Sequence, residues 1–268
     1  MFLRNKIAVI HGAAGSLGGA VAKAFANAGA TVFLTGRRLP LLVKIREEII
    51  QSGGKAEAMQ CDAVNESDVE TCYQKVVEKV GRVDISFNLI SYEDKQGTPL
   101  VDMKLDDFTR PVFKAMTTQF ITATASGRWM KKQKSGVILF LSATPGGSAY
   151  PLVGGFGPAC CAIEAFSRDL ASELGIFGVR VMNMRSGGSP DSRVFVDAVA
   201  NGGDEVKAVL KKMASDTMLK RLPLMSEIAN LAVFLASDHA SAITGNTVDI
   251  TCGTTNALGH QQYGVAFK

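Results

Sequence analysis

The sequence lacks both a strong imbalance of charge and long apolar runs. Its 29 basic and 25 acidic residues leave a net charge of only +4, and no basic run is longer than the pair Lys131-Lys132. This charge is too mild to indicate a nucleic-acid partner. No apolar stretch approaches the roughly 18 residues that a membrane span needs. We therefore expect neither nucleic acid nor a membrane among the partners of this chain.

Cysteine is also scarce, with an odd total of five and none of the spacings typical of a metal site. We therefore expect no bound metal, and we interpret the cysteines as small buried thiols in a reducing compartment. The first strand-like run begins almost at the initiator Met, which leaves no room for a signal peptide ahead of it. These features favour a cytoplasmic protein.

Apolar residues, in contrast, are abundant. They make up 47% of the 268 residues, against 20% for charged residues, which is enough for a large core. Short apolar runs predict strands over residues 6–11, 31–35, 55–60, 83–89, 136–141, 179–184 and 247–251. Amphipathic segments predict helices over residues 17–28, 39–51, 67–80, 105–133, 158–174, 205–213 and 227–236. The segment 186–203 reads as a mobile loop.

This alternation of strands and helices predicts the fold class. It is typical of an α/β protein in which a parallel seven-stranded sheet is doubly wound and covered by helices on both faces. No internal repeat and no linker interrupts the pattern. We therefore expect one domain over residues 1–268, with residues 187–222 forming a substrate loop or lid within it.

A glycine-rich turn joins the first strand to the first helix. It reads His11-Gly12-Ala13-Ala14-Gly15-Ser16-Leu17-Gly18. Small residues at such a turn let the backbone approach a pyrophosphate, and the helix N-terminus presents free N–H groups and a partial positive charge. Because the turn opens a strand–turn–helix unit, it predicts a dinucleotide site.

The end of the second strand bears on the choice of cofactor. An acidic residue at this place binds the ribose hydroxyls of NAD, but here Gly36 is followed by Arg37 and Arg38. A guanidinium suits a 2′-phosphate through paired hydrogen bonds. We therefore favour NADP(H) over NAD(H). The alternative is that both arginines simply solvate the start of a helix.

At this point the sequence resembles the short-chain dehydrogenase/reductase family over nearly its whole length. The family's first motif is Thr-Gly-x-x-x-Gly-x-Gly; Gly12 and Gly18 match it, whereas His11 replaces the Thr and Ser16 the middle Gly. Segments 227–229, 234–238 and 243–245 are similar to the family's C-terminal signature. The resemblance implies a Rossmann-type domain whose cofactor-binding residues are Gly12, Gly15, Ser16, Leu17, Gly18, Arg37, Arg38, Asp62 and Asn88.

The resemblance also implies that the family's four catalytic residues are missing. Family members use Asn, Ser, Tyr and Lys, of which Tyr is the proton donor. The matching positions here hold Ala115, Ala143, Phe156 and Cys160. Alanine donates no hydrogen bond and phenylalanine has no proton to give. A carbonyl that accepts hydride therefore lacks the usual donor.

Other side chains are candidates for the missing roles. Tyr150 and Ser142 are possible acids, although a packing role is the alternative for each. We interpret His11 as a structural residue beneath the phosphates. Tyr92, Glu93 and Asp94 follow the fourth strand and are either substrate contacts or loop surface. Cys160 and Cys161 point about 100° apart on a helix, so we interpret them as packing residues and not as a redox pair.

Two hypotheses follow for the function. The first is an NADP(H)-dependent oxidoreductase that transfers hydride to an activated C=C or C=N group, or that performs a non-redox step in the same pocket. The second is a catalytically inactive nucleotide-binding protein that acts as a regulatory or structural subunit. The expected partners are a small-molecule substrate and copies of the same chain in a homodimer or homotetramer, or an active relative.

Overall fold

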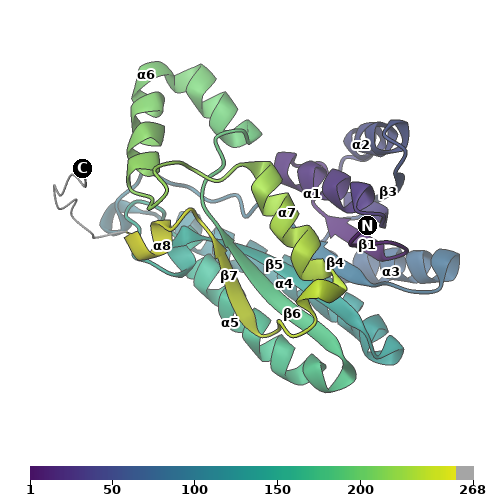
Figure 1. The fold of residues 1–268 in the computed structure, drawn as a ribbon. Helices are drawn as coiled ribbons and strands as arrows, with labels where there is room; N and C mark the ends of the chain where they lie inside the picture. Colours follow the sequence, from purple (N-terminus) through teal and green to yellow (C-terminus); the bar gives the residue numbers. More distant parts are fainter. Residues whose placement is uncertain (258–268) are drawn as a thin grey trace, which may run out of the picture.

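One parallel sheet forms the centre of the molecule. The protein is described here by a computed structural model of residues 1–257. Seven strands pair in the order β3-β2-β1-β4-β5-β6-β7, and every pair is parallel (Figure 1). The strands are β1 (Ile7–His11), β2 (Thr31–Gly36), β3 (Lys55–Gln60), β4 (Ile85–Asn88), β5 (Gly136–Ala143), β6 (Val179–Ser186) and β7 (Asn246–Ile250). All seven predicted strands are confirmed, with ends that differ by a few residues.

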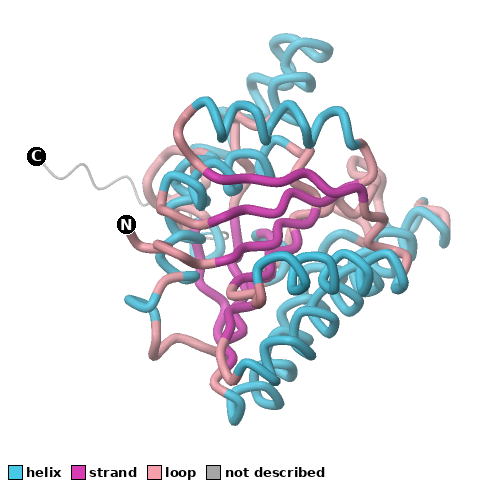
Figure 2. Tube along the Cα trace, turned by 90° about the vertical axis from the view of Figure 1, so that its right-hand side faces the viewer, coloured by secondary structure: helices cyan, strands magenta, loops and turns pink. Residues whose placement is uncertain are grey.

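Helices cover both faces of this sheet (Figure 2). They are α1 (Ser16–Asn27), α2 (Leu39–Gln51), α3 (Glu66–Val80), α4 (Leu105–Gln133), α5 (Phe156–Leu174), α6 (Arg193–Ser215), α7 (Met225–Ala236) and α8 (Thr254–Ala257). Alternate residues of β1 enter different cores. Ala8 and Ile10 pack in a cluster with α1, α2 and α7, whereas Ile7 and Val9 pack with α3, α4 and α5. Burial on both faces explains why the strands are apolar runs.

The loop predicted over residues 186–203 is correct for residues 187–192 and wrong from Arg193 onward. Helix α6 begins at Arg193 and continues to Ser215, with one non-helical residue, Gly203, at φ +57° and ψ −133°. The stretch from 193 to 200 contains no glycine or proline, so it can form helical turns even though glycines lie on both sides. None of the residues of α6 is buried, and Figure 1 shows it projecting from the body of the domain.

No helix within residues 1–257 is both long enough and apolar enough to cross a bilayer.

The sheet's carboxyl edge is the part of the fold that matters for function. Strand order reverses between β1 and β4, because the chain first builds outward to β3 and then returns to the other side of β1. Ligands of open α/β sheets bind in the crevice at such a reversal.

Candidate functional site

A cleft of about 720 Å³ lies at this reversal. The first turn and the ends of four neighbouring strands border it: its lining includes His11, Gly12 and Gly15 from the first turn, Arg37 and Arg38 after β2, Asp62 after β3, and Leu89 and Ile90 after β4. Five of the predicted cofactor-binding residues therefore share one cavity. Arg37 and Asp62 also border a second cavity of about 730 Å³ between β3 and α3.

The glycines of the first turn allow close backbone packing. Gly12 has φ +78°, and a Cβ atom added to it would lie 2.7 Å from the carbonyl oxygen of Leu89. A Cβ atom on Gly18 would lie 2.4 Å from the carbonyl oxygen of Gly12. Both distances are too short for a side chain. Gly12 and Gly18 therefore set the path of the turn, which holds the start of α1 against the cleft.

The N-terminus of α1 has free hydrogen-bond donors. Gly15 occupies the capping position and supplies no side chain, and the first turn of the helix holds no acidic residue. Within residues 1–257, the backbone N–H groups of Ser16, Leu17 and Gly18 have no hydrogen-bond acceptor. An anion such as a pyrophosphate satisfies this donor set. The Ser16 hydroxyl accepts a long hydrogen bond, 3.4 Å, from the backbone N–H of Arg193, which ties the turn to α6.

His11 has a structural environment. Its side chain is buried, with Nδ1 2.8 Å from the Thr35 hydroxyl and Nε2 2.8 Å from the Tyr73 hydroxyl. The Tyr73 oxygen lies 2.7 Å from the Ser86 hydroxyl, which completes a buried polar chain under the first turn. Burial lowers the pKa of His11 to about 3, so the imidazole is neutral at physiological pH. This agrees with the structural role predicted for it.

We expect the buried His11 to make the protein less stable in mild acid. The unfolded chain binds a proton at its ordinary pKa of about 6.5, whereas the folded chain does not until about pH 3. The contribution of neutral His11 is therefore complete above pH 6.5 and is lost as the pH falls. Between pH 6.5 and 5 the free energy of unfolding should drop by about 1–2 kcal/mol.

Urea unfolding at several pH values measures this loss. The His11→Asn variant should lose most of the slope, whereas His239→Asn, at an exposed histidine, should keep it. An identical slope in wild type and His11→Asn would show that His11 does not cause the acid sensitivity.

Asn88, predicted to bind cofactor, supports the loop after β4 instead of lining the cleft. Its amide nitrogen donates to the Thr122 hydroxyl at 3.0 Å, and its amide oxygen accepts from the backbone N–H of Ile90 at 3.0 Å. The side chain is buried. Asn88 therefore fixes the position of Leu89 and Ile90, which do line the cleft.

Three charged side chains from different elements meet in the cleft. Glu93, in the loop after β4, forms an ion pair with Lys114 of α4, and the same carboxylate oxygen lies 3.8 Å from the guanidinium of Arg37. All three residues line the cavity. The sequence did not reveal the part played by Lys114. Lys114 follows Arg110 by four residues, so the sequence does place both on one face of the predicted helix. It does not show that this face meets the cavity, which Arg110 also lines.

The resemblance placed Ala115, Ala143, Phe156 and Cys160 at the family's catalytic positions, and none of these side chains lines the cleft. Ala115 and Cys160 are fully buried, and Ala143 and Phe156 are half-buried. Burial raises the pKa of the Cys160 thiol to about 12, so it is not a ready nucleophile. Cys161 is exposed, and all five cysteines are free thiols. No cluster suited to holding a metal occurs in the part of the chain that the structure describes.

Tyr92 lies among these positions and is buried, so the alternative that it is loop surface is wrong. It packs in the same cluster as Ala115, and its ring centroid lies 6.1 Å from that of Phe156. Its hydroxyl donates to the carbonyl oxygen of Leu141 at 2.8 Å. Burial, and next the neighbouring Cys160 thiol, raise the pKa of Tyr92, which makes it a poor acid. The Tyr92 side chain fits in this place because the residues at positions 115 and 160 have small side chains.

Neither of the two candidate acids, Ser142 and Tyr150, lines the cleft. Ser142 is buried, donates to Glu164 at 2.8 Å and accepts from the Asn183 amide at 2.7 Å. It is therefore held in a polar network and does not line the cleft. Tyr150 is half-buried, and burial raises its pKa. Tyr150 is not among the residues that line the cleft.

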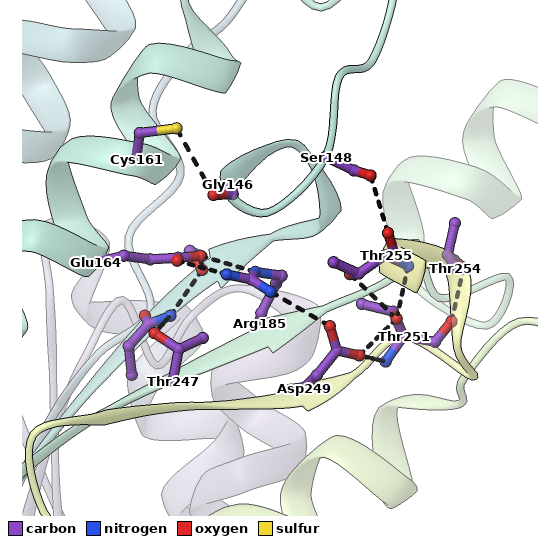
Figure 3. Close-up of polar contacts among 12 residues, drawn as sticks. Gly146, Ser148, Cys161, Glu164, Arg185, Thr247, Asp249, Thr251, Thr254 and Thr255 are labelled. Atoms are coloured by element: carbon purple, nitrogen blue, oxygen red, sulfur yellow. Dashed lines mark hydrogen bonds and ion pairs between the residues drawn. The ribbon is translucent and has the colours of Figure 1, made fainter. Parts of the chain in front are cut away.

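Figure 3 shows the polar network around Glu164, Arg185 and Asp249, which the sequence did not predict and to which Ser142 belongs through its hydrogen bond to Glu164. Glu164 of α5 binds Arg185 of β6 through two hydrogen bonds of 2.9 and 2.6 Å, and Arg185 lies 3.5 Å from Asp249 of β7. Added Cβ atoms on Gly146 and Gly147 would lie 2.3 Å from Glu164 and Arg185 respectively. The loop between β5 and α5 therefore rests directly on this ion pair.

Comparisons with known proteins agree with this geometry. The family model described as "Enoyl-(Acyl carrier protein) reductase" matches residues 12–255. The chain is 27% identical over 256 residues to the 7alpha-hydroxysteroid dehydrogenase of Escherichia coli K12, covering 96% of each. It is 28% identical to an enoyl-[acyl-carrier-protein] reductase [NADH] of Rhizobium meliloti, covering 94% of this chain and 90% of that one.

A solved structure is also similar. NAD+-bound xylitol dehydrogenase superposes with a TM-score of 0.88 at 26% identity, and the match covers 94% of this chain and all of the other. That xylitol dehydrogenase holds NAD+ in its structure.

Proposed function

Because the chain belongs to the short-chain dehydrogenase/reductase family of oxidoreductases, we propose that it binds NADP(H) in the cleft and reduces an activated C=C or C=N group. The observation that carries this proposal is the cavity at the strand-order reversal, bordered by the glycine turn and by Arg37 and Arg38. The acidic residue that would bind the ribose of NAD has no counterpart at the end of β2.

The cleft suits a phosphorylated dinucleotide. The free N–H groups of Ser16, Leu17 and Gly18 would hold the pyrophosphate, and Arg37 and Arg38 would hold the 2′-phosphate. Asp62 would contact the adenine. When bound, the nicotinamide supplies or accepts a hydride. The residues of the chain bind and orient it, and Asn88 holds the loop that forms one wall.

The absence of a proton donor limits the substrates. A simple ketone that accepts hydride develops a full charge on oxygen and needs a donor there. Ala143 and Phe156 offer none, and the Tyr92 hydroxyl is committed to Leu141. Hydride adds to carbon in every case, but an iminium group becomes a neutral amine that needs no proton. An enoyl group accepts hydride at its β-carbon and forms a delocalised enolate, which water can protonate at the α-carbon. An enoyl reductase among the relatives, and the family model of the same description, support this substrate class.

A second candidate is a nucleotide-binding protein without turnover. Tyr92 packs against Phe156 and Ala115, which leaves the catalytic positions filled by aromatic and aliphatic groups. Such a chain would act as a regulatory or structural subunit, alone or with an active relative. A non-redox step in the same pocket is compatible with the same packing.

We further propose a cytoplasmic homodimer or homotetramer in which residues 187–222 close over the substrate. Helix α6 lies in this segment, and Val194 and Val196 near its start are exposed. The contact between Ser16 and Arg193 would couple closure to the first turn. Burial of these valines against a substrate would favour the closed form.

The test of the proposed reaction is NADPH oxidation, followed by absorbance, with an enoyl thioester and a matched saturated ketone. We expect turnover with the enoyl compound and little with the ketone. If NADPH binds but neither enoyl nor iminium compounds oxidise it, the oxidoreductase proposal fails and the non-catalytic function is favoured.

Replacing Arg37 by Ala should weaken NADPH binding by about 1–3 kcal/mol, because a charge-assisted contact with the 2′-phosphate is lost. NADH has no such phosphate, so its affinity should change less than about twofold, which is within the range of a surface charge substitution. Calorimetric titration of both nucleotides measures the difference. Arg168→Ala, at an exposed site on α5, is the control. Equal weakening of both nucleotides would remove the reason to assign a phosphate to Arg37.

A further inference from the structure

The Glu93 carboxylate stands in the part of the cleft where the phosphate of NADP(H) is proposed to bind. Its Oε1 atom pairs with Lys114 and lies 3.8 Å from Nη2 of Arg37. The three residues come from the β4 loop, α4 and the end of β2. Within residues 1–257, Glu93 is the one acidic partner of Arg37. An anionic group of the chain therefore already faces the cation that would take the 2′-phosphate.

The surrounding structure holds Glu93 in this place. Its backbone has φ +57°, a conformation that a residue with a side chain adopts only when its neighbours enforce it. The Lys114 side chain is only 15% exposed, so its ammonium group needs an anion beside it. The hydrogen bond from Lys114, together with the charges of Lys114 and Arg37, lowers the pKa of Glu93 and keeps it ionised.

We propose that Glu93 is an internal substitute for the 2′-phosphate of the cofactor and sets the preference between NADP(H) and NAD(H). This inference rests on the proposed function, because it assumes that the adenosine end of the dinucleotide lies against Arg37. A 2′-phosphate carries a charge of about −1.5 to −2 at pH 7 and offers three acceptor oxygens, so it outcompetes one carboxylate for a guanidinium. The bound phosphate displaces Glu93 and gains Lys114 as a second ligand.

Two consequences follow from this exchange. Glu93 reduces the affinity for the phosphorylated cofactor, because its ion pair with Arg37 must be broken and its charge repels the incoming phosphate. It has little effect on NAD(H), which leaves the pair intact. Since Arg37 and Glu93 are 66% and 51% exposed, the effect is modest. Removing the charge should tighten binding of a 2′-phosphate by about three- to tenfold.

The experiment uses two ligands that differ only in the phosphate, adenosine 2′,5′-bisphosphate and adenosine 5′-monophosphate. Calorimetry on the full chain compares wild type with Glu93→Gln and Lys114→Gln. We expect Glu93→Gln to bind the bisphosphate about three- to tenfold more tightly and the monophosphate within about twofold. Lys114→Gln should weaken bisphosphate binding, because one phosphate ligand is lost and Glu93 is left to Arg37 alone.

Asp94→Asn is the matched control. Asp94 is the next residue in the same loop, accepts a hydrogen bond from Gln96 and contacts neither Arg37 nor Lys114. The Asp94→Asn substitution removes one negative charge, as Glu93→Gln does, and should leave the affinities for the bisphosphate and the monophosphate within about twofold of wild type. Thermal unfolding followed by circular dichroism checks that every variant is folded.

The outcomes separate this inference from the proposed function. If wild type binds the bisphosphate more tightly than the monophosphate but Glu93→Gln gains nothing, or gains equally for both ligands, the inference is overturned and the NADP(H) site stands. If Asp94→Asn gives the same gain as Glu93→Gln, the effect is general electrostatics and the inference is also overturned. If wild type does not prefer the bisphosphate and Glu93→Gln does not create a preference, the proposed function fails with it.

Discussion

Replacing Arg185 by Met is expected to lower the free energy of unfolding by about 3–5 kcal/mol, because it leaves a buried carboxylate without its partner. The Glu164 side chain is 6% exposed and receives two hydrogen bonds from Arg185. The Ser142 hydroxyl also donates to it, but a neutral donor does not replace a guanidinium. Urea unfolding at pH 7 measures the loss.

Two further variants make this prediction specific. The double variant Glu164→Leu/Arg185→Met removes both charges and should recover most of the loss, because an apolar pair needs no counter-charge. Arg128→Met is the matched control, since Arg128 and Glu70 form an exposed pair, which contributes about 1 kcal/mol or less. A loss of under about 1 kcal/mol in Arg185→Met would mean that water or neighbouring groups compensate the Glu164 charge.

Restoring a proton donor should raise ketone reduction only when Tyr92 is also shortened. The variant A143S/F156Y/C160K supplies the Ser, Tyr and Lys that the family resemblance implies are missing from these three positions. General acid catalysis contributes about 10²–10⁴-fold, so kcat/KM for a ketone should rise by that factor in the Tyr92→Ala background. With Tyr92 in place, a lysine at position 160 has no room, because the Tyr92 ring packs against Phe156 and lies next to Cys160.

Steady-state NADPH oxidation measures both backgrounds. Tyr92→Ala without the three substitutions is the control, and it should gain no ketone activity because it opens space without adding a donor. Two results would contradict this account: a wild type that already reduces ketones as fast as the restored variant, or a restored variant that works equally well with Tyr92 present.

Much of the fold was predictable because its signals are local. A strand buried on both faces is an apolar run whatever its neighbours are, so β1 and β5 appear in the sequence directly. The second part of helix α6 was predicted as a helix over residues 205–213, but its first part, residues 193–203, was missed. Glycines lie on both sides of that first part, and none of the residues of α6 is buried, so the sequence pattern there favours a loop. The glycine turn was also recognisable, because its residues are contiguous.

The rest of the site depends on contacts between distant segments. Glu164 and Arg185 look like surface charges on two elements, and only the fold brings them together under the β5–α5 loop. Tyr92 looks like a loop residue in the sequence, because its packing with Ala115 and its proximity to Cys160 exist only in the folded chain. Glu93 likewise follows a strand end as expected, but its placement between Arg37 and Lys114 depends on how α4 crosses the cleft.

The central claim is that the cleft holds NADP(H) in preference to NAD(H). Calorimetric titration of the wild-type chain with NADPH and with NADH tests it most directly. The account predicts that NADPH binds at least about tenfold more tightly, the equivalent of one charge-assisted contact with the 2′-phosphate. Equal affinities, tighter binding of NADH, or no binding of either nucleotide at millimolar concentration would contradict it.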